Sequence, residues 1–479
     1  MSLTFVEKFP SLFYLVSPNR TSFQHYKDVP NYINESIPVF AIVIFAEMFI
    51  RWLTGKENRV NDTVTSGLFG LIHESTVYFS SIFMLIGYEW LYQYRIFELP
   101  WNSVYTWFGA FIFVDFCYYW IHRANHEVNI LWAAHQVHHS QEDYNYSVAL
   151  RISMFQRAAY MGFYQPLALI GFPLSSVGVH AALNLLFQFW VHTELIDNLG
   201  PLEYIFNTPS HHRVHHGVNK WCLDKNYGSV FIIWDRIFGT FEPERKGEEI
   251  VYGLTDQPQT YNVLWHEVFY FGIIYEKFKN MTSWSDSLKA IFYGPGWSPG
   301  SPRLGDPNTF PDIKAPRAKY DPQIPKWKLA YIVFHGILVA ILHHVLVTQL
   351  PVLSTGRVLL YLGFIFATVG IMGGMFDGKR WAGILEVIRC ALLITYGALT
   401  PFTYNANVNS HIIAYFTISI TVWVIHNIGV FKPSIFSIQE LINENSPTQK
   451  THHEQMTSFS EAQKSTVFQF NSCKEQQVI

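Results

Sequence analysis

Nine apolar segments recur along the chain, most of them close to the roughly 20 residues that carry an α-helix across a 30 Å hydrocarbon core. They cover residues 37–53, 71–92, 103–121, 158–172, 177–196, 327–347, 357–376, 381–399 and 412–430. We therefore predict an all-α, polytopic membrane helix bundle of about nine hydrophobic segments. The pair 158–172 and 177–196 is separated by the breaker Gly171-Phe-Pro173, so it either crosses the bilayer or re-enters it.

The composition agrees with a membrane protein. Hydrophobic residues make up 49% of the 479 residues and charged residues 14%, against about 25% charged in ordinary soluble domains. This excludes a soluble globular enzyme and a mainly disordered chain. The net charge of −3 gives no basic footprint, so no nucleic-acid partner is expected. The four cysteines are scattered, which argues against a disulfide scaffold or a thiolate metal site.

The segments divide the chain into four predicted parts. Residues 1–36 form an N-terminal segment, 37–326 a membrane domain with aqueous loops, 327–432 the C-terminal transmembrane helices, and 433–479 a flexible polar tail. Lysines and arginines gather in the loops around residues 51–59, 123–151, 213–246 and 379–380. By the positive-inside tendency these loops face the cytosol and the N-terminus faces the opposite side.

Histidines concentrate in three short motifs, because 11 of the 21 lie between residues 122 and 216. Positions i and i+3 or i+4 share a helical face about 5–6 Å apart at Cβ, so their imidazoles can share an ion. Thr208-Pro209 before the third motif predicts a helix start, with Thr208 as the cap. His192 ends the fifth apolar segment, where such a side chain needs a partner. The motifs are His122-Arg-Ala-Asn-His126, His135-Gln-Val-His138-His139 and His212-Arg-Val-His215-His216.

Eight or nine imidazoles are too many for one ion, so the motifs indicate two metal ions. A single histidine is more often a hydrogen-bonded core residue, and His73, His180, His266, His335 and His426 are interpreted in that way. Imidazole suits both zinc and iron. Soluble di-iron proteins use Glu and Glu-x-x-His pairs instead, and spacing alone does not choose between the metals.

These motifs and their flanks resemble the membrane fatty acid hydroxylase/sterol desaturase superfamily. The three histidine motifs match its three boxes, and the likeness extends over residues 114–123, 133–146, 188–196, 207–216 and 224–241. The resemblance covers roughly residues 20 to 305, whereas the C-terminal segments agree only in hydropathy. Within the superfamily the flanks are most similar to the pterin-dependent branch that acts on ether lipids.

The resemblance implies an enzyme of the endoplasmic reticulum membrane whose active site faces the cytosol. Such an enzyme uses O₂ and tetrahydrobiopterin to hydroxylate the alkyl carbon next to the ether oxygen of a 1-O-alkylglycerol, which then falls apart to a fatty aldehyde and a glycerol. A pterin-recycling system would supply the electrons. Two iron ions are implied, with His192 as a further ligand beside the eight catalytic, metal-binding histidines, namely His122, His126, His135, His138, His139, His212, His215 and His216.

Three further expectations concern the surroundings of the motifs. Glu127 matches an acidic position linked with pterin use, or it pairs with Arg123 at i, i+4. Asp115 precedes His122 by seven residues and either orients an imidazole or is a polar residue buried among the helices. A substrate cavity is predicted to be lined by Phe116, Tyr119, Phe187 and Trp190.

Two alternatives stay open from the sequence. One is a sterol or fatty acyl hydroxylase or desaturase of the same superfamily that receives electrons from cytochrome b5. The other is a histidine-rich metal transporter or sensor. Transporters favour polar residues along a membrane path, often in repeated halves, whereas the intramembrane carboxylates here are few and unrepeated.

Overall fold

The computed structural model describes residues 4–160, 162–350, 352–400 and 406–431. The regular secondary structure of the described residues is helical, with isolated β-bridges in place of strands, and loops connect the helices. The chain divides into two compact units, residues 1–389 and 390–479, each considered by itself. The predicted tail 433–479 lies outside the described residues, and the four predicted parts stay predictions.

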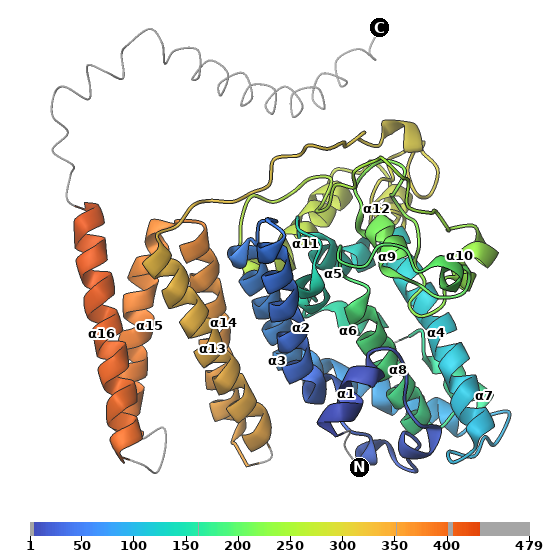
Figure 1. Ribbon diagram of the computed structural model, residues 1–479, viewed down its shortest axis with the longest axis horizontal. Helices are drawn as coiled ribbons and strands as arrows, with labels where there is room; N and C mark the ends of the chain where they lie inside the picture. Colours follow the sequence, from blue (N-terminus) through green and yellow to red (C-terminus); the bar gives the residue numbers. More distant parts are fainter. Residues whose placement is uncertain (1–3, 161, 351, 401–405, 432–479) are drawn as a thin grey trace, which may run out of the picture. The chain divides into compact units, whose positions relative to one another are not determined.

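Six helices among the described residues are long and apolar enough to cross a membrane. The predicted all-helical membrane architecture is confirmed by them (Figure 1), while the number of crossings stays a prediction. The predicted segment 71–92 forms the second part of α3 (Val60–Tyr92). The six helices are α2 (Tyr32–Leu53), α4 (Val104–Glu127), α13 (Lys326–Gln349), α14 (Thr355–Phe376), α15 (Arg380–Leu399) and α16 (Ala406–Phe431).

The pair of apolar segments around Gly171 is not two equal helices. The first contains only α6 (Gln156–Tyr160) and α7 (Gln165–Ile170), and the second forms α8 (Leu174–Trp190). Six residues of helix rise about 9 Å, so α7 is too short to cross a bilayer. Gly171 has a φ of 112°, and a Cβ there would lie 2.0 Å from the carbonyl oxygen of Phe97. Only glycine fits this turn, which confirms the predicted breaker.

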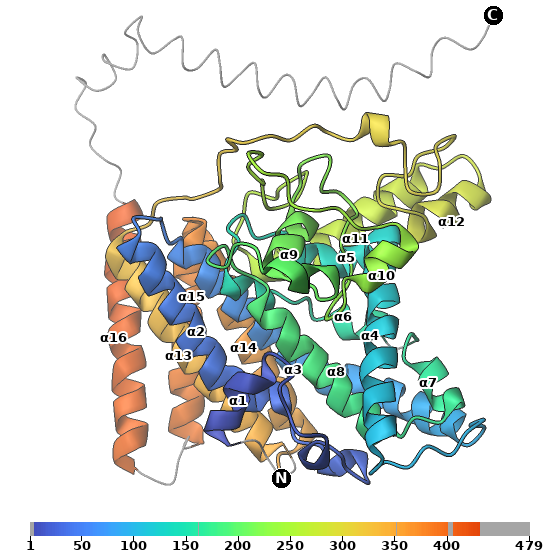
Figure 2. The same cartoon turned by 45° about the vertical axis from the view of Figure 1, so that its right-hand side comes forward.

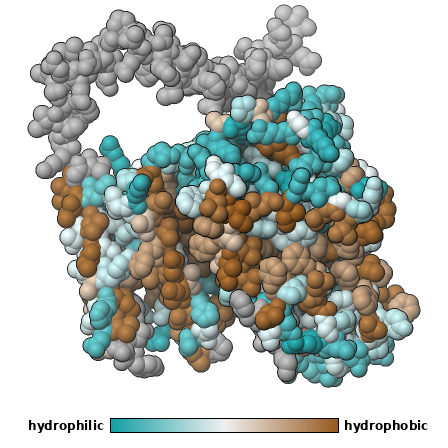
Figure 3. Space-filling view, viewed as in Figure 1, coloured by the Kyte–Doolittle hydropathy of each residue, from teal (hydrophilic) through white to brown (hydrophobic). Residues whose placement is uncertain are grey.

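A polar region lies at one end of the helices of the first unit. Figure 3 shows hydrophilic side chains over these loops and a hydrophobic band across the helices of this unit below them. The histidine motifs sit where the two meet, at the end of α4, on α5 and on α9 (Figure 2). The helices of this region are α5 (Asn129–His139), α9 (Pro209–His216), α10 (Ile233–Phe238), α11 (Val263–Lys279) and α12 (Trp284–Phe292), and α1 (Phe5–Ser11) precedes α2.

Candidate metal centre

Nine histidines converge at this end of the helices in two groups. Within each group, one ring nitrogen of every member lies within 4.8 Å of those of the others. The structure therefore brings together all eight box histidines and His192. The first group is His122, His126, His135, His139 and His215, and the second is His138, His192, His212 and His216.

Each of the two H-x2-H-H boxes serves both groups. On α5 the i, i+4 pair His135 and His139 joins the first group, while His138 joins the second. On α9 the arrangement is reversed, because His212 and His216 join the second group and His215 joins the first. The groups touch where the rings of His139 and His216 stack, 4.3 Å apart at their centroids. The two groups are therefore neighbouring sites held by shared helices.

Backbone carbonyls orient several of these rings. His122 Nδ1 lies 2.9 Å from the carbonyl oxygen of Tyr227, and His215 Nδ1 lies 2.9 Å from that of Lys225. A carbonyl can only accept, so each Nδ1 must carry the proton, which leaves the Nε2 lone pair free. This is the tautomer in which Nε2 binds a metal.

The second group shows most directly why an ion fits. His138 and His192 donate their Nδ1 protons to the carbonyls of Arg151 and Gln188, at 3.2 and 2.7 Å. Their Nε2 atoms lie 3.3 Å apart, so two lone pairs face each other. Such a pair is repulsive unless a cation lies between the nitrogens. In the first group, the Nε2 atoms of His126, His139 and His215 are buried without a hydrogen-bond partner in the described structure.

Burial keeps the imidazoles of α5 and α9 neutral. It lowers the pKa of His139, His212, His215 and His216 well below the ordinary value, and neighbouring imidazoles lower it further. A metal ligand must be unprotonated, so the site is prepared for an ion near neutral pH. Zinc and iron both accept such a donor set.

We expect the metal-free protein to lose stability as the pH falls below about 6.5, the pKa of an imidazole in the unfolded chain. There the unfolded chain binds protons that the folded chain excludes, so each such imidazole costs about 1.4 kcal/mol per pH unit. Thermal unfolding of the metal-free protein between pH 8 and 5 measures this. A midpoint independent of pH would contradict the buried, neutral state.

Asp115, which lies on α4 seven residues before His122, does not orient an imidazole. Its carboxylate accepts hydrogen bonds from Asn184 Nδ2 at 2.8 Å, from the backbone N–H groups of Val230 and Phe231 at 2.9 and 3.2 Å, and from Trp234 Nε1 at 2.8 Å. Of its two predicted roles, Asp115 therefore has the second, that of a polar residue buried among the helices. Asp115 joins α4 to α8 and to the loop that follows Tyr227.

Two buried groups that sequence reasoning missed fix the same loop and the second box. Asp235 accepts from the N–H groups of Tyr227 and Gly228, at 2.7 and 2.6 Å, and so holds the carbonyl that orients His122. Glu47 of α2 accepts from the N–H of Tyr146 at 2.7 Å. The sequence signal for Asp235 was its place in residues 224–241, one of the stretches that resemble the superfamily, and the signal for Glu47 was a carboxylate inside an apolar segment.

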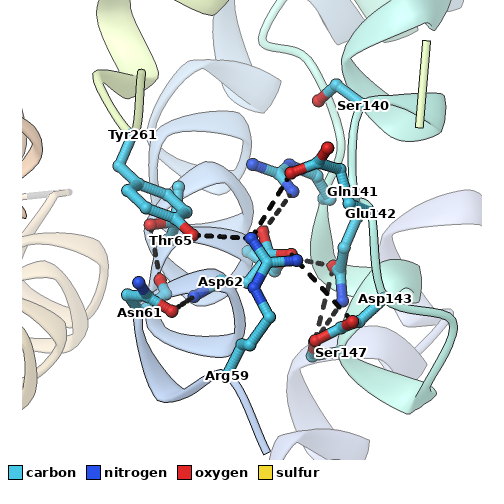
Figure 4. A network of polar contacts seen from close by, with 12 residues as sticks. Arg59, Asn61, Asp62, Thr65, Ser140, Gln141, Glu142, Asp143, Ser147 and Tyr261 are labelled. Atoms are coloured by element: carbon cyan, nitrogen blue, oxygen red, sulfur yellow. Dashed lines mark hydrogen bonds and ion pairs between the residues drawn. The ribbon is translucent and has the colours of Figure 1, made fainter. Parts of the chain in front are cut away.

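A buried ion network supports the second box from the other side (Figure 4). Arg59 lies 3.3 Å from Asp62, 3.4 Å from Glu142 and 3.6 Å from Asp143. Arg151 pairs with Asp62 at 2.8 Å, and its carbonyl is the acceptor for His138. The second box lies on α5, and the network thus ties the start of α3 to the loop that follows this helix.

Glu127 is paired with two arginines. One carboxylate oxygen lies 2.7 Å from Arg123 Nε and the other lies 3.1 Å from Arg303 Nη1. The predicted i, i+4 pair with Arg123 is therefore present, and Arg303 adds a second contact. A role of Glu127 in pterin use stays a prediction.

The predicted set of aromatic residues that line the substrate cavity is mostly wrong. An apolar cavity of about 550 Å³ lies between α4 and residues 162–170, and Phe116 lines it. Tyr119 instead bonds to Thr240, while Phe187 and Trp190 pack in a hydrophobic core with Leu12 and Tyr32. Trp120, which also lines this cavity, lies on the face of α4 opposite His122, so this cavity does not lead to the histidines along α4.

The remaining histidine predictions concern the helix start and the core. Helix α9 begins at Pro209 with Thr208 at its N-cap position, as predicted, although Thr208 Oγ1 donates to Glu203 and makes no capping hydrogen bond. His73 and His266 contact backbone carbonyls at 2.8 and 2.9 Å, and both lie outside the two groups. Their interpretation as core histidines agrees with these contacts.

Comparisons with known proteins match this picture. The fatty acid hydroxylase family model matches residues 107–240, which include all nine histidines. The alkylglycerol monooxygenase C-terminal domain model matches residues 329–414, so the expectation that the C-terminal segments agree only in hydropathy was wrong. No solved structure matches the chain. The fold and site thus define a membrane fatty acid hydroxylase-type enzyme.

Curated relatives narrow the class. Alkylglycerol monooxygenase of Xenopus tropicalis is 44% identical over 80% of this chain and 86% of its own length. The proteins of the same name from Homo sapiens and Danio rerio are 41% and 40% identical, over 87% and 84% of this chain and 94% and 90% of theirs. The chain belongs to the alkylglycerol monooxygenase family. It is therefore an enzyme, a multi-pass membrane monooxygenase of lipids.

Proposed function

We propose that this enzyme hydroxylates the alkyl carbon next to the ether bond of 1-O-alkylglycerols, with O₂ and tetrahydrobiopterin, at a pair of iron ions. The hydroxylated ether then falls apart to a fatty aldehyde and a glycerol. The observation that carries the proposal is the pair of histidine groups with converging lone pairs. The name of the relatives, alkylglycerol monooxygenase, supports alkylglycerols as the substrate class.

The donor set fits two metal ions, and the monooxygenase activity favours iron over zinc. Zinc has no redox chemistry, whereas iron, when bound, supplies the O₂ activation that no side chain can supply. His122, His126, His135, His139 and His215 would hold one ion. His138, His192, His212 and His216 would hold the other.

The chain's own residues hold and orient the ligands and keep water out. Eight of the nine histidines are at most 6% exposed, so solvent has little access to the two groups. His138 is the half-buried member. A lipid substrate can meet this site from the membrane, because α4 and the other spans place it at the edge of the hydrophobic band. Water exclusion protects the reacting carbon from side reactions.

We further propose that the protein resides in the endoplasmic reticulum membrane, with the histidine end facing the cytosol. Arg51 in the last turn of α2 and Arg59 just after this helix lie at this end. The loop between α14 and α15 is tied to the same end by Asp377, which accepts from the N–H of Tyr261 at 2.7 Å. Lys379 lies in that same loop, and Arg380 is the first residue of α15. Several basic loops on one side support a cytosolic placement.

The electron source separates this proposal from the main alternative, a cytochrome b5-dependent hydroxylase or desaturase. We expect purified protein to convert a 1-O-alkylglycerol to fatty aldehyde with tetrahydrobiopterin alone. Cytochrome b5 with its reductase should not replace the pterin. The measurement is aldehyde formed per enzyme under each electron supply, with heat-inactivated protein as the control. Product with cytochrome b5 and no pterin would contradict the proposal.

A metal transporter or sensor is the more distant alternative. Eight of the nine histidines are buried in protein, whereas a transport path needs exchangeable sites. Metal uptake into vesicles that contain the protein would favour this alternative over the enzyme.

A further inference from the structure

A second cavity, polar and about 360 Å³ in volume, lies beside the four-histidine group. This volume is within the range of roughly 300–1,000 Å³ typical of small-molecule sites. Its walls come from the end of α2, the loop after the second box, the segment after α8, the loop 244–252 and the extended segment 315–319. All of these belong to the first unit.

Two stacked tyrosines separate this cavity from the histidines. Tyr144 and Tyr252 both line it, and their rings stack at 4.9 Å with an interplanar angle of 17°. On its other side, the Tyr144 ring lies 5.4 Å from the ring of His216 and 5.9 Å from that of His192. A molecule in the cavity is therefore close to the four-histidine group and can rest against an aromatic ring.

The charges of the cavity indicate what it can bind. Two of its carboxylates, Asp197 and Glu249, have no ion pair or side-chain hydrogen bond in the described part of the chain, and both are exposed. Of its cations, Lys56 has no ion pair or side-chain hydrogen bond in the described part of the chain. Arg51, Arg213 and Lys319 are paired with carboxylates, and Arg317 donates to a backbone carbonyl. The other acidic side chains are paired: Glu142 and Asp143 with Arg59, Glu194 with Arg51, Glu244 with Arg213, and Glu248 with Arg245.

Unpaired carboxylates favour a ligand that offers several N–H donors, and the tyrosine wall favours a flat ring. A reduced pterin has both features, because its amino group and ring N–H groups form a donor edge on a planar heterocycle. A carboxylate that accepts from such an edge makes a strong, oriented contact. The Lys56 ammonium can donate to the pterin's carbonyl oxygen.

We propose that this cavity is the docking site of the reduced pterin, with Asp197 and Glu249 accepting from its donor edge and Tyr252 beside its ring. The inference rests on the proposed function. In the overall reaction, one oxygen atom enters the C–H bond of the lipid. The other leaves as water with two hydrogens from the tetrahydropterin, which becomes a dihydropterin. The stacked rings of Tyr144 and Tyr252 then lie between this two-electron donor and the metal ligands.

Anaerobic calorimetry tests the site directly. Tetrahydrobiopterin is titrated into metal-loaded, full-length protein in nanodiscs. Glu249→Gln and Asp197→Asn should each raise the Kd about tenfold, because each loses a charge-assisted hydrogen bond. Their metal content and thermal unfolding should match wild type. Glu98→Gln, whose side chain is 83% exposed before the start of α4, is the matched control and should bind as wild type.

The outcomes separate the cavity from the wider proposal. Wild-type affinity for tetrahydrobiopterin in both cavity variants would overturn the docking site. It would leave the proposal of pterin-dependent turnover untouched. Loss of binding in Glu127→Gln alone would place the pterin beside the five-histidine group and would also overturn it. If wild type binds no pterin and turnover needs none, the proposed electron source fails together with the docking site.

Discussion

Replacing His215 with alanine should abolish turnover and leave the protein with about half of its metal. His215 belongs to the five-histidine group, and its Nδ1 is held by the carbonyl of Lys225. Loss of a residue that merely orients a ligand costs about 10–100-fold in metal affinity or activity. We therefore expect a loss of at least about 100-fold for the ligand itself. Aldehyde formation and metal content per chain are the two measurements.

The same experiment on α5 tests the partition into two groups. His138→Ala should also abolish turnover, but it should empty the four-histidine site and leave the other ion bound. His211→Ala is the matched control, because His211 is buried on α9 and belongs to neither group. It should keep its full metal content. Full activity in the His215 or His138 variant would remove that residue from the ligand set.

Replacing Asp115 with alanine should destabilise the protein by at least about 3 kcal/mol, because it strands several buried donors. The carboxylate accepts from two backbone N–H groups and two side chains. The loop it holds continues from Tyr227, whose carbonyl orients His122. Metal content should therefore fall as well. Thermal unfolding and metal analysis in nanodiscs measure both effects.

The control for Asp115 is an exposed aspartate. Asp256→Asn alters an exposed side chain in the loop before α11, so it should change stability by no more than about 0.5 kcal/mol. An Asp115→Ala variant with wild-type unfolding would show that the loop does not depend on the carboxylate. Wild-type stability with lost metal would instead point to a direct role at the first histidine group.

Local spacing predicted the histidine motifs because a helix fixes which residues share a face. His122 and His126 lie together on α4 for that reason alone. The division of each H-x2-H-H box between two groups was not predictable, since it depends on how α4, α5 and α9 meet. For the same reason Asp115 could not be assigned, because Val230 and Phe231 lie more than 100 residues away.

The membrane segments were predictable from hydropathy, which reports burial in lipid or protein without telling them apart. Residues 158–172 are apolar, yet they form two short helices around an interruption and not one span. Phe187 and Trp190 were assigned to a cavity, but their rings pack in the core. The aromatic composition indicates a membrane setting and does not show which ring meets a substrate.

Iron content per chain of the purified, full-length enzyme, together with a Mössbauer spectrum of protein loaded with ⁵⁷Fe, tests the two-ion site most directly. Five imidazoles in one group and four in the other predict about two iron ions per chain and two nitrogen-rich iron environments. One iron per chain in fully active enzyme, or full activity with zinc alone, would contradict the account.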